Sequence, residues 1–204
     1  MADNATLQVL WNRCRHLLLS SLQGSLDHAA NNGMQHEVLQ GKQPMGFNGR
    51  FRVYKYSPDD FFQFHMDGSW PGARMLNGTL VEDAFLSENV QSWYSFLMAL
   101  SDDYVGGETV FRVQKRNHHP TDPYRFTTLG NDGDDPMTAT TTTVPVRTPM
   151  GGVLAFPHGE HPWQCLHAST PIQQGTKYII RVDVLFGNKE EEDGGGPNEE
   201  QKVA

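Results

Sequence analysis

His65 and Asp67 stand two residues apart at the end of an aromatic segment, just before Gly68. If that segment is a β-strand, both side chains leave the same face, because strand residues i and i+2 point the same way. An imidazole nitrogen and a carboxylate oxygen would then lie close enough to share a metal ion. By itself a His-x-Asp pair is a weak signal, since it is more often a surface histidine beside an aspartate that forms a turn.

A third ligand has to come from another part of the chain, and His167 is the best candidate. It follows the apolar stretch 163–166, so we expect it at the end of a buried strand. Two histidines and one carboxylate leave three adjacent positions open on an octahedral metal, which suits a non-haem Fe(II) oxygenase better than a closed structural zinc site. Four other histidines are rival ligands in predicted loops, where a histidine is most often solvated: His118, His119, His158 and His161.

The segment from Gly175 to Asp183 has an apolar side and a polar side if it is a strand. Alternation places Lys177, Arg181 and Asp183 on one face and bulky apolar residues on the other. In an ordinary sheet the polar face is simply exposed to water. In a barrel that holds a ligand, a lysine or arginine on that face can anchor a carboxylate.

Most of the chain from Arg50 onward is predicted to form short strands joined by turns rich in glycine and proline. The apolar run 92–100 is either a helix or a buried strand, because periodicity does not separate the two in so short a segment. Short strands at this spacing indicate an antiparallel sandwich or barrel. The expected strands are 51–56, 61–65, 109–113, 144–148, 152–156, 163–167 and 176–186.

Residues 6–22 carry apolar side chains at spacings of three and four, which predicts an amphipathic helix that covers one face of a core. A helix that lies on a membrane surface or binds a partner is the less favoured alternative. The apolar stripe consists of Leu7, Leu10, Trp11, Cys14, Leu18 and Leu22.

Two segments contain too few apolar residues to offset the entropy lost on ordering. The segment 117–143 combines two histidines, several aspartates and a threonine run, and we expect a long polar loop or insertion there. The segment 187–204 holds four consecutive acidic residues followed by three glycines, and we expect a disordered acidic tail. Residues 1–186 then form a single domain, which agrees with the length of the chain.

The composition argues against several classes of protein. The 204 residues contain no apolar run of about 18, the length that a membrane span needs, and the N-terminus lacks a signal-peptide pattern, so we expect a cytoplasmic or nuclear protein. The 16 basic residues are outnumbered by 24 acidic ones, which argues against a protein held on nucleic acid by phosphate contacts. Two cysteines are too few for a disulfide framework or a four-cysteine zinc site.

Five short motifs occur in the order and at the spacings typical of one enzyme family. They are His65-x-Asp67, Gly106-Gly107-Glu108-Thr109, Gly152-Val153-Leu154-Ala155-Phe156, His167 and Gly175-Thr176-Lys177. Through these motifs, residues 45–186 resemble the 2-oxoglutarate- and Fe(II)-dependent dioxygenases, specifically the prolyl 4-hydroxylase-like branch. The ten-residue step from His167 to Lys177 matches that branch.

The resemblance implies a mainly β fold with flanking helices. The expected architecture is a double-stranded β-helix, a jelly-roll-like, cupin-type barrel, with the N-terminal amphipathic helix against the outside of a sheet. Residues 92–100 are then a buried strand. The resemblance also implies an Fe(II) ion held by His65, Asp67 and His167, with 2-oxoglutarate and O2 as cosubstrates and ascorbate as reductant.

The same resemblance implies where 2-oxoglutarate binds. Lys177 would pair with its distal carboxylate. Tyr56, nine residues before His65, would line the same pocket, although it is otherwise explained as a core or surface aromatic residue. Arg181 is a rival anchor, because some related oxygenases use an arginine there, but the spacing favours Lys177.

The activity implied is hydroxylation of an unactivated C–H bond, with release of succinate and CO2. A peptidyl proline is the first substrate expected, so a peptide or protein partner is predicted, with no stable nucleic acid and no membrane. The same chemistry on a small molecule or nucleobase is an alternative, and a non-catalytic barrel that binds a metal or a protein is a further one. The segments Pro58-Asp59-Asp60 and Ala168-Ser169 depart from the family pattern, which leaves the primary substrate open.

Overall fold

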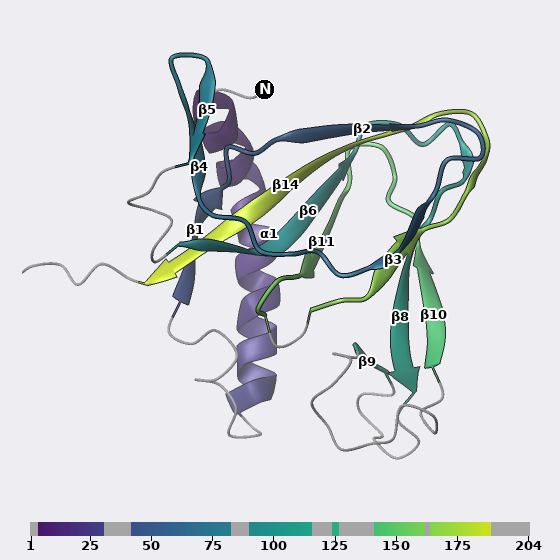
Figure 1. Cartoon of the computed structure of the whole chain (residues 1–204). Coiled ribbons are helices and arrows are strands. Elements are labelled where there is room, and N and C mark those ends of the chain that lie inside the picture. Colours follow the sequence, from purple (N-terminus) through teal and green to yellow (C-terminus); the bar gives the residue numbers. More distant parts are fainter. Residues whose placement is uncertain are drawn as a thin grey trace, which may run out of the picture.

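The structure is a computed structural model, shown in Figure 1. It describes residues 4–30, 42–82, 90–115, 124–126, 141–161 and 164–188. These residues contain one helix and the strands β1 to β14. The helix is α1 (Asn4–Ala30). The first strands are β1 (Lys42–Phe47), β2 (Arg52–Tyr56), β3 (Phe62–His65), β4 (Ala73–Leu76), β5 (Thr79–Glu82), β6 (Gln91–Ala99) and β7 (Val105–Gly106). The later strands are β8 (Thr109–Lys115), β9 (Tyr124–Phe126), β10 (Thr141–Val146), β11 (Val153–Pro157), β12 (His167–Ser169), β13 (Ile172–Gln174) and β14 (Lys177–Asn188).

Two antiparallel sheets contain the strands that position the candidate site. The larger sheet has the order β1–β14–β6–β11, with β2 also paired to β14. The smaller sheet has the order β10–β8–β12–β3, with β9 paired to β8. From β2 to β14 the chain passes back and forth between these two sheets, if the two-stranded pairs β4–β5 and β7–β13 are left aside. The exception is β8, β9 and β10, which follow one another in the smaller sheet. This is the strand order of a double-stranded β-helix, so the predicted fold is confirmed.

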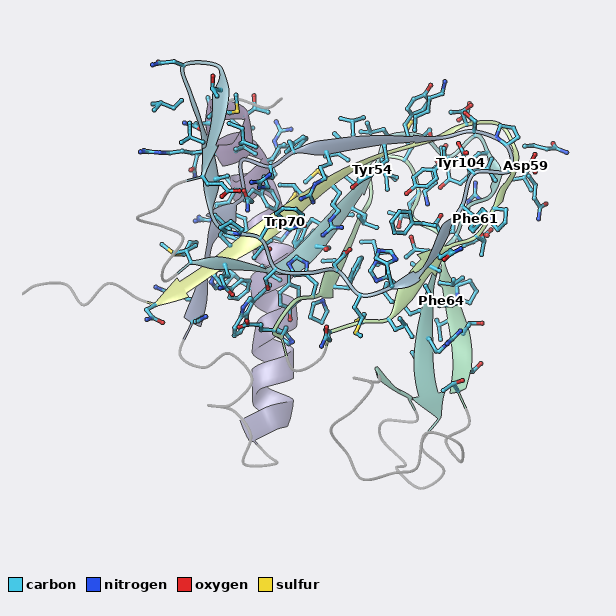
Figure 2. All side chains as sticks on the ribbon, in the orientation of Figure 1. Tyr54, Asp59, Phe61, Phe64, Trp70 and Tyr104 are labelled. Carbon is cyan, nitrogen blue, oxygen red and sulfur yellow. The ribbon has the colours of Figure 1, made fainter. Side chains whose placement is uncertain are left out.

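Apolar side chains from both sheets meet between them, and the sticks in Figure 2 show how side chains fill the space between the ribbons. Phe111 and Val113 of β8 belong to one buried cluster with Phe156 of β11 and with Cys165. The rings of Phe111 and Phe156 lie edge to face, 5.3 Å apart between centroids. Burial of such large rings stabilises the face-to-face packing of the two sheets.

Helix α1 covers the outer face of the larger sheet, as expected for the amphipathic stripe of residues 6–22 (Figure 1). The ring of Phe47 in β1 packs against Trp11 of the helix and Phe96 of β6, with its centroid 5.3 Å from each. The helix is longer than the stripe predicts. No helix in the described ranges is long and apolar enough to cross a membrane. Trp11, Phe47 and Phe96 belong to one buried apolar cluster between the helix and the larger sheet. Its other members are Leu7, Cys14, Leu18, Trp93, Tyr94, Met98, Val182, Val184 and Phe186.

Strand β14 separates two environments by alternation. Val182 and Val184 are fully buried in the cluster beneath α1. Arg181 and Asp183 point to the opposite face, where Arg181 bonds to Asp67 and Asp183. The predicted polar face of this strand therefore lies inside the barrel, and the apolar face packs against the helix.

Several elements differ from the expectations. The strand expected over 163–167 is wrong in its position, because β12 starts at His167; Cys165 and Leu166 are buried without being part of a strand. The expected polar loop 117–143 contains β9 and the start of β10, since the β-branched threonines from Thr141 onward pair with β8. Its other residues lie outside the described part, as do residues 189–204. Strands β1, β7 and β13 and the β4–β5 hairpin have no counterpart among the predicted strands.

Replacing Trp11 with alanine is expected to lower the free energy of unfolding by about 3–5 kcal/mol, because it removes a buried ring and leaves a cavity between α1 and the larger sheet. Val9 lies on the same helix and is 51% exposed, so Val9→Ala is the matched control. That control should change stability by less than about 0.5 kcal/mol. Urea unfolding followed by circular dichroism measures both, and equal effects of the two substitutions would contradict the packing of α1 on the sheet.

Candidate metal centre

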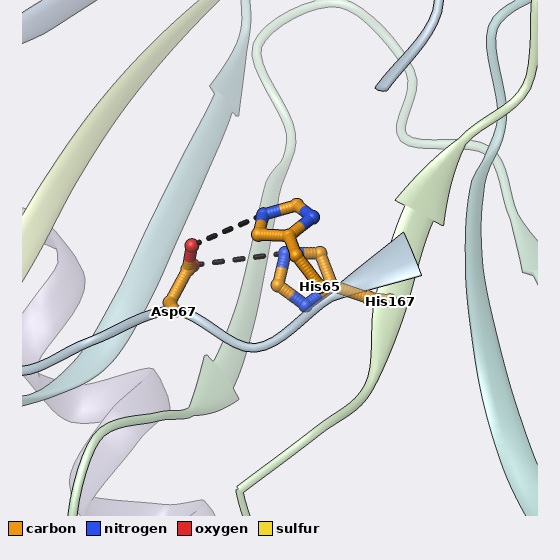
Figure 3. Close-up of side chains that lie close together, drawn as sticks. All are labelled: His65, Asp67 and His167. Carbon is orange, nitrogen blue, oxygen red and sulfur yellow. Dashed lines mark ion pairs between the residues drawn. The ribbon is translucent and has the colours of Figure 1, made fainter. Parts of the chain in front are cut away.

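The ladder between β3 and β12 brings two of the predicted ligands together. In its antiparallel register His167 stands opposite His65, and the imidazole centroids are 4.3 Å apart. Side chains of directly opposed residues share one face of a sheet. Asp67 follows just after the end of β3 and completes the group (Figure 3). One ligand atom from each residue lies within 4.8 Å of the others, so the three side chains could hold a metal ion.

Both imidazoles present the same nitrogen to the carboxylate. Nδ1 of His65 lies 2.8 Å from the carbonyl oxygen of Gln63, and Nδ1 of His167 lies 2.9 Å from that of Cys165. A carbonyl only accepts, so each Nδ1 carries the proton and each Nε2 of a neutral ring keeps a lone pair. Nε2 of His65 is 3.3 Å from Oδ1 of Asp67, and Nε2 of His167 is 3.7 Å from Oδ2.

These three electron-pair donors face one another in a largely buried position. Asp67 and His167 are each 6% exposed. Two ligand atoms bound to one metal at about 2.1 Å and at right angles are about 3 Å apart, and the ligand atoms here lie within 4.8 Å of one another, so the side chains must move closer together to close around an ion. Two imidazoles and one carboxylate on adjacent positions form the ligand set of non-haem Fe(II) sites. The residues present therefore fit Fe(II).

Two side chains from the larger sheet hold the Asp67 carboxylate. Nη1 of Arg181 donates to Oδ1 at 2.6 Å, and the hydroxyl of Ser95 donates to Oδ2 at 2.7 Å. Burial opposes the charge, but a hydrogen bond from Nε2 of His65 in its protonated form and the nearby guanidinium of Arg181 hold the pKa of Asp67 well below its usual range. The carboxylate is therefore ionised at neutral pH and needs to lose no proton before it binds a metal.

Arg181 lies against the predicted metal ligand, and protein carboxylates already occupy most of its guanidinium. Nε donates to Oδ1 of Asp183 at 3.1 Å while Nη1 donates to Asp67. Burial opposes its charge, yet Asp183 and Asp67 raise the pKa of Arg181. Among the described residues, Nη2 has no hydrogen-bond partner. As an anchor for a ligand carboxylate, Arg181 thus has one nitrogen left.

Lys177 is a buried cation at the start of β14. It is 5% exposed, and its Nζ donates to the carbonyl of Gly107 at 2.6 Å and to the hydroxyl of Ser169 at 3.3 Å. Burial lowers the pKa of Lys177 to about 8. Two of the three ammonium hydrogens are used, and no ion pair is formed with Lys177 within the described ranges. A carboxylate at this position would stabilise the charge.

The surroundings of Lys177 come from both sheets and from the turn before β8. Tyr56 stands opposite Lys177 in the β2–β14 ladder, with its ring 5.2 Å from Nζ. Gly107 has a φ of +69°, and a Cβ there would lie 2.3 Å from Cδ1 of Ile172, so the turn that offers its carbonyl to the lysine requires glycine. A small cavity beside the lysine is lined by Leu97, Ala99, Tyr104, Thr109, Val146, Thr148 and Ile179.

Two of the rival histidines are buried, which corrects the expectation that they are solvated. His158 and His161 are each 1% exposed, and neither belongs to the potential metal-binding group found in the described residues. The ring of His161 packs edge to face against Trp93 and Tyr94, with centroids 5.6 and 5.2 Å away. Their burial was not predicted because both histidines lie in a segment that the sequence indicates to be a loop. The other two rivals, 118 and 119, lie outside the described residues.

Sequence reasoning missed Ser95, which bonds directly to the predicted metal ligand Asp67. The available signal was its setting, because Ser92 and Ser95 are polar residues in the otherwise apolar run 92–100. A buried hydroxyl in such a strand needs a partner. The sequence does not reveal which partner, since Asp67 lies in a different segment.

No protein-family model matches the chain, and no curated protein matches it. Two solved structures of the viral collagen prolyl hydroxylase from Paramecium bursaria Chlorella virus 1 align with it. The first, a complex with 2-oxoglutarate, is 15% identical, with a TM-score of 0.36, and the alignment covers 83% of this chain and 73% of that one. The second, a truncated form, is 13% identical, with a TM-score of 0.42 and coverage of 92% and 73%. The fold follows from the strand order of this chain itself.

The affinity for a divalent metal is expected to fall as the pH is lowered through the pKa of His65. Burial works to lower that pKa, but the hydrogen bonds with Asp67 and with the Gln63 carbonyl raise it above the ordinary value of 6.5. Because its pKa is raised, His65 keeps its second proton to a higher pH than an ordinary histidine does, and this proton must leave before the metal binds. Burial lowers the pKa of His167, which therefore adds to the loss only at lower pH.

Anaerobic Fe(II) titrations from about pH 8 to about pH 5 measure this dependence. Below the pKa of His65 the apparent affinity should drop about tenfold for each pH unit, because one proton competes with the metal. The exposed acid Asp103 provides a control, and Asp103→Ala should leave the profile unchanged. An affinity that stays constant across the whole range would contradict ligation by these imidazoles.

Proposed function

We propose that this protein is a 2-oxoglutarate- and Fe(II)-dependent dioxygenase that hydroxylates an unactivated C–H bond, with a peptidyl proline as substrate. The observation that carries the proposal is the meeting of His65, Asp67 and His167 around one point inside the barrel. The two imidazoles offer Nε2 and the carboxylate is held ionised, so the group is a ready ligand set. The buried cation of Lys177 lies in the same barrel.

In the proposed enzyme, the side chains of this site bind the metal and the cosubstrate and orient them. When bound, Fe(II) would activate O2, the oxidant for C–H hydroxylation; 2-oxoglutarate would supply half of the electrons that reduce O2 and end as succinate and CO2, and the C–H bond would supply the rest. His65, Asp67 and His167 would occupy adjacent positions on the metal and leave the others for ligands and O2. Hydrogen bonds at both Nδ1 atoms and at both carboxylate oxygens hold these groups in place before the metal arrives.

Lys177 supports a cosubstrate that carries a carboxylate away from the metal. A buried ammonium without a counterion is costly, and a carboxylate in the neighbouring cavity would offset that cost. Ser169, which accepts a bond from Lys177, stands two residues after His167 on the same face of β12, so the ammonium of Lys177 reaches across from the larger sheet to the strand that carries His167. Arg181 is the rival anchor. Because its guanidinium already bonds to the carboxylates of Asp67 and Asp183, Lys177 is the better partner for the carboxylate of the cosubstrate.

Features beside the metal ligands support a peptide substrate. A cleft of about 500 Å³ is lined by Asp67, Met66 and Trp70 among others. Aromatic side chains along the same segment are exposed, with values of 54% for Phe61, 37% for Phe64 and 39% for Trp70 (Figure 2). Exposed aromatic rings bind proline-containing segments well, because their flat faces pack on the proline ring. A small molecule or a nucleobase, the alternative substrates, would need the cleft but not the exposed aromatic rings.

Succinate release in the presence of Fe(II), 2-oxoglutarate and ascorbate tests the enzymatic proposal. The wild-type protein should release succinate, and Asp67→Ala should reduce the rate at least about 100-fold, because it removes a ligand rather than an outer hydrogen-bond partner. The matched control is Asp103→Ala, which removes an exposed carboxylate. Equal rates for wild type and Asp67→Ala would favour a non-catalytic metal-binding or protein-interaction module.

Mass spectrometry of a library of proline-containing peptides identifies the substrate class in the same assay. The expected product gains one oxygen atom on a proline. Succinate release that depends on Asp67 without any oxidised peptide would shift the proposal to a small molecule or nucleobase.

Lys177→Ala is expected to raise KM for 2-oxoglutarate about 10- to 100-fold, which corresponds to the loss of a charged hydrogen bond worth about 1.5–3 kcal/mol. Fe(II) affinity should stay unchanged, since Lys177 is not a ligand. In the wild type KM should also rise above about pH 8, where Lys177 loses its proton. Lys55 is an exposed lysine on β2, and Lys55→Ala serves as the control. An unchanged KM in Lys177→Ala, with a raised KM in Arg181→Lys, would assign the anchor to Arg181.

A further inference from the structure

The connection between β11 and β12 runs back beside the segment that carries Asp67. Its first residue, His158, donates its backbone N–H to the carbonyl of Trp93 at 2.8 Å, and Gly159 donates to the carbonyl of Asp67 at 2.9 Å. Gly159 has a φ of +63°, and a Cβ there would lie 1.9 Å from Oγ of Ser69. Only glycine allows this close approach, so the connection is fixed directly against the segment of the metal ligand.

A continuous chain of hydrogen bonds joins the His158 ring to the Asp67 carboxylate. Oγ of Ser95 lies 2.7 Å from Nδ1 of His158 and 2.7 Å from Oδ2 of Asp67. On the other side of the ring, Nε2 lies 2.9 Å from Oγ of Ser92, which accepts the backbone N–H of Trp70 at 2.8 Å. Ser92 and Ser95 are fully buried, and His158 is 1% exposed. The chain therefore lies entirely inside the protein.

The ionised carboxylate sets the direction of every bond in this chain. A carboxylate only accepts, so the Ser95 hydroxyl hydrogen points at Asp67, and the Ser95 oxygen accepts from Nδ1–H of His158. Burial lowers the pKa of His158, which keeps the ring neutral. Its Nε2 then has a lone pair that accepts the hydroxyl hydrogen of Ser92. Each donor in the chain has one acceptor, and the pattern is self-consistent.

We propose that His158 is a positioning residue for the metal centre, which acts through Ser95 to hold Oδ2 of Asp67 while Arg181 holds Oδ1. This role rests on the proposed function, since it is a role toward the metal bound by His65, Asp67 and His167.

Asp67 needs a donor on Oδ2 because the neighbouring guanidinium of Arg181 can compete for that oxygen. With no donor on Oδ2, both oxygens of Asp67 can turn to the guanidinium of Arg181, because a two-bond pair is the preferred arrangement of these groups. The carboxylate would then rotate relative to the two imidazoles. A donor on each oxygen, from two different strands, opposes that rotation.

His158 matters because a serine hydroxyl rotates freely about its C–O bond. While Nδ1–H of His158 donates to the oxygen of Ser95, the remaining hydroxyl hydrogen is directed to Asp67. Without the ring, Ser95 loses the donor that orients it, and its bond to Oδ2 weakens. The expected consequence is a weaker and less regular metal site, with no change in the ligands themselves.

The experiment measures metal binding directly, with Fe(II) alone under anaerobic conditions and with Co(II), whose visible spectrum reports the coordination geometry. In His158→Phe and in Ser95→Ala the dissociation constant should rise about 10- to 100-fold, the usual cost of losing an outer hydrogen-bond partner of a ligand, and the Co(II) spectrum should change. His158→Asn places an amide N–H near the position of Nδ1–H and should restore most of the affinity and the wild-type spectrum.

His161→Phe is the matched control, because His161 is as buried as His158 and its Nε2 lies 3.4 Å from the hydroxyl of Tyr94. Its Fe(II) affinity and Co(II) spectrum should equal those of the wild type. Thermal unfolding of each metal-free variant shows whether it is folded. Should His158→Phe fail to fold, the comparison of Ser95→Ala with His158→Asn still decides the role.

The outcomes separate this role from the proposed function. If wild type and Asp67→Ala bind Fe(II) equally, the metal centre itself is wrong. If wild type binds Fe(II) and Asp67→Ala does not, the metal centre stands. If, in addition, folded His158→Phe and Ser95→Ala keep the wild-type affinity and Co(II) spectrum, the positioning role of His158 is overturned. Equal losses in His158→Phe and His161→Phe would also overturn it, since they would reflect a general effect of core substitution.

Discussion

The buried charge of Asp67 is the feature on which the rest of the site depends. A carboxylate that is only 6% exposed has lost most of its hydration, and such a charge is stable only when it is paired and hydrogen-bonded. Arg181 and Ser95 meet this requirement with one donor on each oxygen. Because His65 and His167 approach the same carboxylate with their Nε2 atoms, the arrangement that stabilises the charge also prepares a cation site.

Each sheet supplies a different part of this arrangement, so the packing of the sheets and the geometry of the ligands are coupled. The smaller sheet contributes His65 and His167 through the β3–β12 ladder, and the larger one contributes the donors to Asp67. The distance between the sheets is set by the aromatic core, in which Phe156 lies 5.3 Å from Phe111 and 4.5 Å from His167 between centroids. A close-packed core of this kind transmits a change in volume directly to its neighbours.

Strand β14 shows how one segment serves stability and function together. Its Val182 and Val184 are completely buried beneath α1, while Lys177, Arg181 and Asp183 face the interior of the barrel. Burying three charged groups is unfavourable unless each has partners. The helix offsets part of this cost, because it gives the outer face of the same strand a large apolar surface to pack against.

The sequence by itself determined the features that depend on neighbouring residues: the shared face of His65 and Asp67, the two faces of β14, and the buried stripe of α1. It also supported His167 as the third ligand through a family resemblance, although position alone left four rival histidines open. Tertiary structure decided that Arg181 bonds to Asp67 and that a loop histidine, His158, is buried behind it. The physical reason is that periodicity is a local property of successive residues, whereas strand register and the packing of connections bring together segments that no short stretch of sequence contains.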